Sequence, residues 1–264
     1  MYRTEPLKVI DPRAVIDPGA ELEEGVVVGP FAVIGAGVQI GRGTEIGSHV
    51  VIHGPCRIGR DNRIYQFASV GEDPQDKKYA GEETRLEIGD RNKIREFTTI
   101  HRGTVQDESL TSIGDDNLLM AYSHVAHDCH IGNHTIMANA ASLGGHVHVG
   151  DWAILGGFSI IHQFCRIGPH AFTAMGSAVS KDVPPYVMVG GHPAKPRGIN
   201  SEGLRRRDFS AEQVAAIKRG YRQLYTSGLS LADARTQITE AAAEHEELRL
   251  MAEFLAASER SILR

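Results

Sequence analysis

The sequence has few of the residues that cross-link a small fold. Its three cysteines, Cys56, Cys129 and Cys165, are far apart and form no C-x-x-C pair. This excludes a disulfide framework and a zinc knuckle and is typical of a reduced, cytosolic protein. No run approaches the roughly 18 uncharged apolar residues of a membrane span. The N-terminal residues, MYRTEPLKVIDP, also lack the apolar core of a secretory signal. We therefore expect a cytoplasmic protein that does not span a membrane.

Positive charge is not in excess either. Lysine and arginine number 28 against 33 acidic residues, which gives a net charge of -5 and argues against a general nucleic-acid binder. The chain has a single tryptophan but 29 glycines, and 41% of its 264 residues are hydrophobic. We expect a packed core, together with a backbone that requires many glycines.

A strict six-residue period accounts for those glycines. Aliphatic residues recur without a gap at Ile10, Ile16, Leu22, Val28, Ile34, Ile40, Ile46, Ile52, Ile58, Ile64 and Val70. Neither a helix nor simple alternation gives this period. Three hexads per turn predict a triangular coil, in which each aliphatic residue points inward and stacks on its equivalent 18 residues away, about 4.8 Å along the axis. The glycine that often follows the aliphatic residue is expected at the tight corners, where positive φ favours glycine, asparagine and aspartate.

The period is interrupted twice. It resumes at Ile88 after a gap, and it starts again one residue out of phase at Ile113, running to Val179. The sequence therefore predicts a β-helix over residues 1–190, with loops extruded at about 71–86 and 101–112. Long loops in compact domains usually carry function.

A helical pattern replaces the hexads near the C-terminus. Pro184-Pro185 cannot donate ladder hydrogen bonds, and Gly190, Gly191, Pro193 and Pro196 follow them. Ser210-x-x-Gln213 is a capping box before an apolar stripe. We expect a linker and a helical domain over residues 191–264, which either cap the coil or bind a ligand.

Histidines are the candidate reactive groups. His127, His146 and His162 are spaced by close to one coil, so we expect them to line one wall. Asp128 beside His127 suits a base and its orienting carboxylate, provided that a corner brings the two side chains together. The bare backbone of Gly144-Gly145 can stabilise a developing oxyanion. No serine or cysteine nucleophile stands beside these groups in a recognisable pattern, which favours direct transfer.

Several motifs together resemble one family. His124-Val125-Ala126-His127-Asp128-Cys129, Ile100-His101-Arg102-Gly103-Thr104, Tyr65-Gln66-Phe67-Ala68-Ser69, His162-Gln163-Phe164-Cys165 and Asp182-Val183-Pro184-Pro185-Tyr186 are similar to motifs of the UDP-N-acetylglucosamine 3-O-acyltransferases of lipid A biosynthesis. The resemblance covers essentially the whole chain. It implies a left-handed parallel β-helix of hexapeptide repeats with a C-terminal α-helical domain.

The resemblance also implies an activity and a set of site residues. The family moves an (R)-3-hydroxyacyl chain from acyl carrier protein to the 3-hydroxyl of UDP-N-acetylglucosamine, as a homotrimer with sites between neighbouring coils and with no cofactor or metal. His127 would be the general base, Asp128 its partner and the Gly145 N–H the oxyanion donor. The implied substrate-binding residues are Asp76, Lys78, His124, His146, His162, Gln163, Asn200, Glu202, Arg206 and Arg207. Guanidinium groups suit diphosphate oxygens.

Two positions of this sequence, Met175 and His192, are ones at which members of the family differ from one another. Met175 stands at the floor of the acyl groove, where glycine is typical of long-chain members and methionine of shorter-chain members. We therefore expect a 3-hydroxydecanoyl preference, although Met175 is alternatively a core filler. His192 lies in a linker that varies within the family, and its role stays open.

Other functions compete with this one. A γ-type carbonic anhydrase is also a trimeric left-handed β-helix and would bind zinc through histidines. The N-acyltransferase of the same pathway would be expected to have a further N-terminal domain, whereas the hexads here begin at Ile10. An acetyl-CoA-dependent hexapeptide enzyme and a non-catalytic β-helical scaffold are the remaining alternatives.

Overall fold

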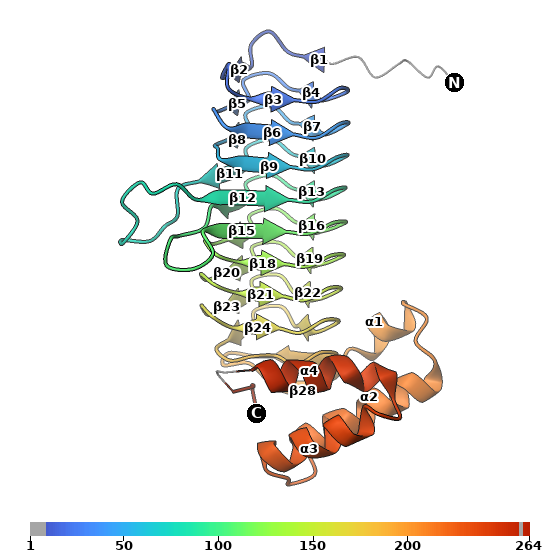
Figure 1. Cartoon of the computed structure of the whole chain (residues 1–264). Coiled ribbons are helices and arrows are strands. Elements are labelled where there is room, and N and C mark those ends of the chain that lie inside the picture. Colours follow the sequence, from blue (N-terminus) through green and yellow to red (C-terminus); the bar gives the residue numbers. More distant parts are fainter. Residues whose placement is uncertain (1–8, 259–260) are drawn as a thin grey trace, which may run out of the picture.

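The chain forms a left-handed β-helix that is closed at one end by α-helices, as the computed structural model shows (Figure 1). The structure describes residues 9–258 and 261–264, so the first eight residues of the predicted β-helical domain lie outside it. Within the described residues, three sheets of 11, 9 and 8 strands form the three sides of the coil, and all strand pairs are parallel except one at the C-terminal end of the first sheet. The predicted fold is confirmed.

The strands are mostly two residues long, and every third strand belongs to the same sheet. The first sheet contains β1 (Val9–Ile10), β4 (Val27–Val28), β7 (Glu45–Ile46), β10 (Arg63–Ile64), β13 (Lys93–Ile94), β16 (Leu118–Leu119), β19 (Ile136–Met137), β22 (Ile154–Leu155), β25 (Phe172–Thr173), β27 (Val187–Gly190) and β28 (Lys195–Ile199). The second contains β2 (Val15–Ile16), β5 (Val33–Ile34), β8 (Val51–Ile52), β11 (Ser69–Glu72), β14 (Thr99–His101), β17 (His124–Val125), β20 (Ser142–Leu143), β23 (Ile160–Ile161) and β26 (Ala178–Val179). The third contains β3 (Glu21–Leu22), β6 (Val38–Ile40), β9 (Cys56–Ile58), β12 (Arg85–Ile88), β15 (Leu110–Ile113), β18 (His130–Ile131), β21 (His148–Val149) and β24 (Arg166–Ile167).

The hexad aliphatics fill the interior as predicted. Ile100 pairs with Val125, Val125 with Leu143, and Leu143 with Ile161, so equivalent side chains stack in one column. All four are at most 1% exposed. The first coil differs, since Ile10 is 37% exposed. Among residues 9–258 and 261–264, its strand β1 pairs only with β4, so a described coil covers it on one side alone.

The corners correct one expectation from the sequence. The residues at positive φ are often large and not glycine, and they include Phe31, His49, Phe67, Phe97 and Tyr122. A left-handed residue costs roughly 1–2 kcal/mol. These five rings stack on one another at 4.9–5.2 Å, and each stacked pair can return about 0.5–1.5 kcal/mol. The ring column therefore offsets the backbone strain.

Glycines after the inward aliphatic serve a different purpose. Gly41 does not have positive φ, yet a Cβ on it would lie 2.7 Å from the carbonyl carbon of Gly59. A Cβ on Gly29 would likewise lie 2.8 Å from the backbone nitrogen of Ser48. These glycines allow neighbouring coils to approach closely, which is why they repeat with the hexads.

Two segments leave the coil on the same side of the molecule (Figure 1). One joins β11 to β12 and the other joins β14 to β15. The segment between β11 and β12 is tied to the coil by the buried Arg102, whose guanidinium donates to Asp73 and to the Tyr79 hydroxyl.

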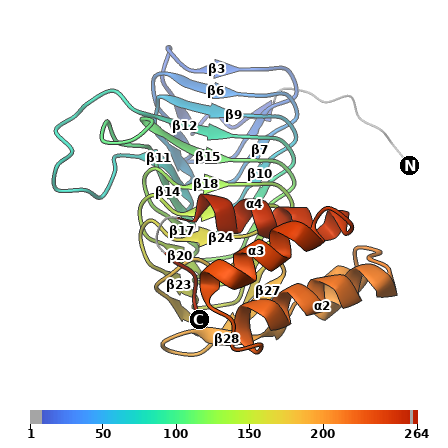
Figure 2. The same ribbon diagram turned by 60° about the horizontal axis from the view of Figure 1, so that its bottom comes forward.

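The C-terminal helices pack across the last coil (Figure 2). They are α1 (Ser201–Arg205), α2 (Ala211–Tyr225), α3 (Leu231–Ala241), the short 3-10 helix η1 (Glu246–Leu248) and α4 (Arg249–Ala257). The capping box of Ser210 and Gln213 is present at the start of α2. Residues 195–199, which the sequence assigns to a linker, form β28 and pair antiparallel with β27. Gly191, at φ 110, supports the tight turn between them. No helix within the described residues is long and apolar enough to cross a membrane.

Candidate functional site

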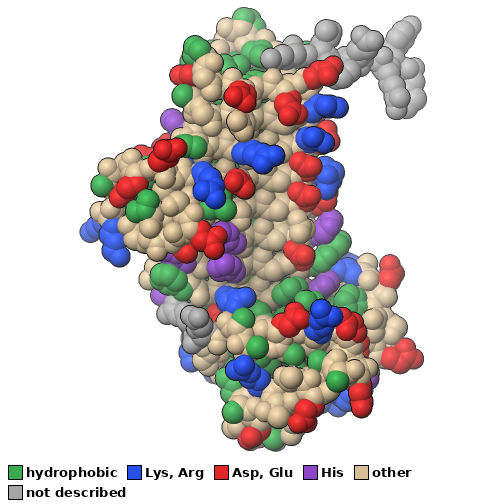
Figure 3. Space-filling view, viewed as in Figure 1, with side chains coloured by type: hydrophobic (Ala, Val, Ile, Leu, Met, Phe, Trp, Pro, Cys, Tyr) green, Lys and Arg blue, Asp and Glu red, His purple; other side chains and the backbone are tan. Residues whose placement is uncertain are grey.

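A corner of three successive coils brings the candidate reactive groups together. It follows β17, β20 and β23, whose residues Val125, Leu143 and Ile161 are in register. Two residues after Val125 and Leu143 in their respective coils, His127 faces Gly145. The following position is Asp128 in the first of these coils and His146 in the second. Figure 3 shows histidine side chains gathered between the extruded loops and the helical cap.

Asp128 is the buried centre of this corner. Its side chain is 0% exposed, and its φ of 57° turns the chain so that it meets the adjacent His127. The corner that the sequence analysis required is therefore present. Oδ2 lies 2.8 Å from His127 Nδ1 and accepts from Thr104 Oγ1 at 2.6 Å, while Oδ1 accepts from the Thr104 N–H at 2.7 Å. Burial favours the neutral acid, but these hydrogen bonds and the charge of His146 outweigh it and lower the pKa of Asp128.

His127 presents its other ring nitrogen to a bare stretch of backbone. With Nδ1 donating to Asp128, Nε2 is left as a proton acceptor. A Cβ on Gly145 would lie 2.7 Å from that nitrogen, so only glycine fits here. Among the described residues, the Gly145 N–H donates to no other group. The candidate base His127 and this N–H of Gly145 therefore belong to adjacent coils and lie next to each other.

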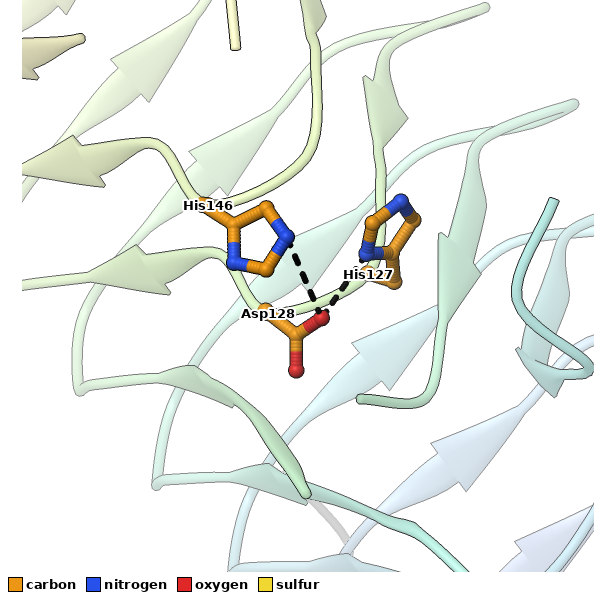
Figure 4. Close-up of side chains that lie close together, drawn as sticks. All are labelled: His127, Asp128 and His146. Atoms are coloured by element: carbon orange, nitrogen blue, oxygen red, sulfur yellow. Dashed lines mark hydrogen bonds and ion pairs between the residues drawn. The ribbon is translucent and has the colours of Figure 1, made fainter. Parts of the chain in front are cut away.

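His146 flanks His127 and Asp128 (Figure 4). It also contacts a second carboxylate, that of Asp107. Its Nδ1 lies 2.7 Å from Oδ2 of Asp107, and its Nε2 lies 3.8 Å from Oδ2 of Asp128. The ring stacks on Phe164 at 4.3 Å and meets the His127 ring edge-on at 5.1 Å. The hydrogen bond at Nδ1 and the two ring contacts therefore hold His146 in place.

His124 lies on the same wall, one residue before the inward Val125. Its Nδ1 lies 2.7 Å from the Thr99 hydroxyl, and its ring contacts His101 edge-on. Burial, followed by the charges of His101 and His127, lowers the pKa of His124 to about 4. His124 is consequently neutral near physiological pH and can position a substrate by hydrogen bonding.

His162 and Gln163 correct the predicted alignment. The three histidines expected at equivalent positions share the corner but are offset, because their spacings of 19 and 16 differ from the 18-residue coil. His162 follows Ile161 directly and so is level with Gly144, whereas His146 is level with Asp128. Both His162 and Gln163 are exposed at the rim.

His127, Asp128 and His146 are also the group whose ligand atoms could hold a metal ion, since they lie within 4.8 Å of one another. This is the donor set that a zinc enzyme would need. In this structure, however, Asp128 Oδ2 already accepts two short hydrogen bonds, from His127 and Thr104. These contacts satisfy the Asp128 carboxylate by hydrogen bonds from within the chain.

The predicted substrate residues of the first loop lie apart from His127 in one chain. Asp76 Oδ1 accepts from the Lys78 N–H at 3.0 Å, which closes a turn in the segment between β11 and β12. Within the described residues, no hydrogen bond or ion pair joins either residue to His127. The segment projects from the side of the coil (Figure 1).

The predicted C-terminal residues gather at a different corner. Asn200 caps α1 and donates to the carbonyl of His170, and Arg207 donates to the carbonyl of Trp152 while its guanidinium lies over the indole ring. Trp152 and His170 stack at the corner that follows the third sheet, whereas His127 follows the second. Glu202 forms ion pairs with Arg205 and Arg206 on the surface of α1. The chain does not bring this group to His127.

Met175 is 82% exposed, so the alternative that it fills the core is wrong. It precedes Gly176, whose N–H donates to the Gly157 carbonyl at the corner between the first and second sheets. That corner is the one that carries the aromatic column of Phe97 and Tyr122. The side chain is therefore free to limit a groove on the surface of the coil.

The sequence analysis missed Thr104 and Asp107. Both lie in the extruded segment between β14 and β15, and they hold Asp128 and His146 respectively. The available signal was position, because the break in the hexads at about 101–112 lies one coil before the candidate reactive histidines. Nothing in the period indicated which loop residues would point inward.

Comparisons with known proteins agree with the geometry. Residues 182–263 match the family model "Udp N-acetylglucosamine O-acyltransferase; Domain 2", and residues 110–145 match "Bacterial transferase hexapeptide (six repeats)". An acyl-(acyl-carrier-protein)–UDP-N-acetylglucosamine O-acyltransferase of Stutzerimonas stutzeri is 57% identical, over 98% of this chain and 100% of its own length. A solved structure of LpxA from Acinetobacter baumannii is 48% identical with a TM-score of 0.95, over 97% of this chain and 100% of that one. The UDP-N-acetylglucosamine acyltransferase of Francisella novicida is 44% identical with a TM-score of 0.95, over 97% and 94%.

The low pKa of His124 predicts a pH-dependent stability. The folded-state pKa of about 4 lies below the roughly 6.5 of an unfolded histidine, so the unfolded chain binds the proton first as pH falls. The corresponding stability is complete above about pH 6.5 and is lost progressively toward about pH 4. The thermal midpoint of His124→Gln should therefore fall less than that of the parent between about pH 7 and about pH 5. The exposed His192→Gln should follow the parent, and equal slopes for the parent and His124→Gln would contradict the prediction.

Proposed function

The chain belongs to the UDP-N-acetylglucosamine O-acyltransferase family, and from that premise we propose a direct acyl transfer in which His127 is the general base. The enzyme is an acyl-(acyl-carrier-protein)–UDP-N-acetylglucosamine O-acyltransferase. The acceptor atom is the sugar 3-hydroxyl, the acyl chain is (R)-3-hydroxydecanoyl, and the product enters lipid A biosynthesis. These finer points are the proposal.

One observation carries the mechanism: His127 Nδ1 is held by Asp128, and Nε2 faces the unhindered backbone of Gly145. Nε2 takes the proton of the sugar hydroxyl while its oxygen attacks the thioester carbonyl. The Gly145 N–H donates to the resulting oxyanion. As the tetrahedral intermediate collapses, the C–S bond breaks and the leaving thiolate receives the proton from His127. Asp128 stabilises the imidazolium between the two proton transfers.

Buried thiols support direct transfer over a covalent acyl-enzyme. Cys129, the cysteine nearest His127 in sequence, is fully buried, and burial raises its pKa to about 12. A thiol of that pKa provides almost no thiolate at neutral pH. The attacking nucleophile is therefore the substrate hydroxyl itself.

The two separated groups of substrate residues support a homotrimer with shared sites. Within one chain, Arg207 and Asn200 lie at another corner from His127, so a single chain supplies only part of the expected diphosphate and sugar contacts. Large apolar side chains also stand exposed along the coil, and they include Phe31, Phe67, Phe97, Tyr122, Phe158 and Ile160. Apolar surface of this kind marks interaction sites. In the trimer, a neighbouring copy would bring Asn200, Glu202, Arg206 and Arg207 to the His127 corner.

The remaining residues have roles at the rim of that shared cleft. Asp76 and Lys78 would contact the sugar nucleotide or the acyl group, and His124, His146, His162 and Gln163 would position the substrates. Acyl carrier protein is acidic in general and would approach basic residues near the cleft. We place the reaction in the cytoplasm, because the three cysteines are free and buried and the carrier-bound donor belongs to that compartment.

The first test is an assay with UDP-N-acetylglucosamine and carrier protein loaded with 3-hydroxyacyl chains of three lengths. The parent should turn over the 3-hydroxydecanoyl donor, and His127→Ala should lower kcat by about 10²–10⁴-fold, because a general base is lost. His245→Ala, on the far helical end, serves as the control. Absence of turnover with any chain length would refute the activity, and an active His127→Ala would refute the base.

Met175 should set the acyl length. Met175→Gly should shift the preference from 3-hydroxydecanoyl toward 3-hydroxytetradecanoyl donors, because each further buried methylene stabilises the bound chain by about 0.8 kcal/mol once space exists. The readout is the ratio of kcat/KM for the two donors. Met175→Leu, of similar volume, should keep the parent ratio, and an unchanged ratio in Met175→Gly would overturn the assignment.

A shared site predicts complementation between inactive chains. His127→Ala and Arg207→Ala should each be nearly inactive, yet trimers reassembled from an equal mixture should regain activity. If chains mix at random, about one quarter of the sites combine an intact His127 with an intact Arg207. The specific activity of mixed trimers is compared with that of each variant reassembled alone. Activity no higher than in the separate variants would contradict sites built from two copies.

A further inference from the structure

One short loop contacts Asp128, His146 and the first extruded segment. Residues 102–107, here called the strap, follow β14 and lead toward β15. Arg102 holds the segment between β11 and β12, Thr104 holds Asp128, and Asp107 holds His146. Three different parts of the expected site therefore depend on six consecutive residues.

Thr104 makes the closest of these contacts. It is 1% exposed, and it donates twice to a carboxylate that is itself 0% exposed: from its N–H to Oδ1 at 2.7 Å and from Oγ1 to Oδ2 at 2.6 Å. Oδ2 also accepts a hydrogen bond from His127 Nδ1 at 2.8 Å. The hydroxyl of Thr104 and the imidazole of His127 thus share one oxygen. Hydrogen bonds to a buried charged group are among the stronger ones in a protein.

The strap is itself fixed, so the contact is built into the backbone. The Thr104 carbonyl accepts the N–H groups of Asp107 and Ser109 at 3.2 and 3.1 Å. A Cβ on Gly103 would collide with the backbone of Leu110, so the strap closes only with glycine at that position. Thr104 cannot turn away from Asp128 without opening this turn.

We infer that Thr104 is a positioning residue. Its two hydrogen bonds fix the orientation of the Asp128 carboxylate. Its hydroxyl also stabilises part of the negative charge on Oδ2, the oxygen that binds His127. The inference rests on the proposed role of His127 as the base. Without the Thr104 hydroxyl, Oδ2 of Asp128 would keep only the hydrogen bond from the His127 imidazole. The protonated form of His127 would then be favoured, and the base would become available only at higher pH.

The other charged or titratable groups around His127 are few in the described residues. His124 lies on the preceding strand β17, and His146 lies one coil on, with its Nε2 3.8 Å from Asp128 Oδ2. Asp107 stands beyond His146. None of these changes when only the hydroxyl of Thr104 is removed, so a change in the titration of His127 is attributable to that hydroxyl.

Thr111 provides a matched control for a purely structural effect. It is also a fully buried threonine bonded to Asp128, but its hydroxyl accepts from the Asp128 backbone N–H at 2.8 Å and does not touch the carboxylate. Thr111→Val and Thr104→Val each remove one buried hydroxyl next to the same residue. Only Thr104→Val alters what the carboxylate presents to His127.

The experiment measures the pH at which His127 becomes reactive. The whole protein is treated with diethyl pyrocarbonate over a range of pH, and the modification of His127 is followed by peptide mass spectrometry, alongside the pH profile of kcat/KM. In Thr104→Val, both the modification midpoint and the acid limb of the profile should move to higher pH by roughly half a unit. The value of kcat should fall roughly 10-fold with little change in KM. Thr104→Ser should restore the parent values, and Thr111→Val should keep the parent midpoint.

An unmoved midpoint in Thr104→Val, or an equal movement in Thr111→Val, would overturn the inference and leave Thr104 as a packing residue. The modification midpoint is independent of turnover. A parent that modifies normally but transfers no acyl group therefore refutes the proposed function, while the midpoints of the variants still decide the role of Thr104.

Discussion

Hydrogen bonding between equivalent positions of successive coils is the constraint on which the molecule depends. It is clearest inside the tube, where the side-chain oxygen of Asn62 accepts the N–H of Asn92, that of Asn92 accepts the N–H of Asn117, and that of Asn117 accepts the N–H of Thr135, at 2.7–2.9 Å. A buried N–H left without a partner costs about 1–3 kcal/mol, so a coil cannot slip against its neighbour at low cost. Because the register between coils is fixed, the number of residues between two positions determines where they lie relative to each other. Gly145 faces His127 for this reason.

The two extruded loops are the means by which chemistry enters this regular frame. The spacing between hydrogen-bonded partners is 18 residues from Thr44 to Asn62, 30 from Asn62 to Asn92 and 25 from Asn92 to Asn117, yet the column itself stays intact. The inserted residues are displaced outward, and their ends remain fixed by the coil. Thr104 and Asp107 use that fixed point to reach a carboxylate and an imidazole that belong to later coils. The coil thus supplies the candidate reacting groups and their register, and the loop between β14 and β15 supplies the hydroxyl and the carboxylate that hold them.

Sequence reasoning succeeded where periodicity governs and failed where it does not. The inward positions Ile100 and Val125 could be predicted because a six-residue period fits only a three-sided coil. The contact of His127 with Asp128 could be predicted because a corner of that coil turns two adjacent side chains toward each other. His162 is offset from His146 because their spacing of 16 residues is two short of the 18-residue coil. Large residues such as Phe97 at positive φ contradict local propensity and are tolerated because rings in neighbouring coils stack. Thr104 could not be identified, because loop conformation leaves no periodic trace.

The two ends of the tube differ in how firmly they are closed. The last coil carries a hairpin and is covered by helices, with Tyr186 donating from its hydroxyl to the Glu247 carbonyl. In the part of the chain that the structure describes, β1 has a neighbouring strand on one side only. In a structure where each coil is held by its neighbours, opening starts at the less protected terminus and advances coil by coil. The His127 corner lies toward the protected end. Thermal fraying would therefore begin in the early coils and reach the reacting groups only later, so the solenoid shields its chemistry by distance along its own axis.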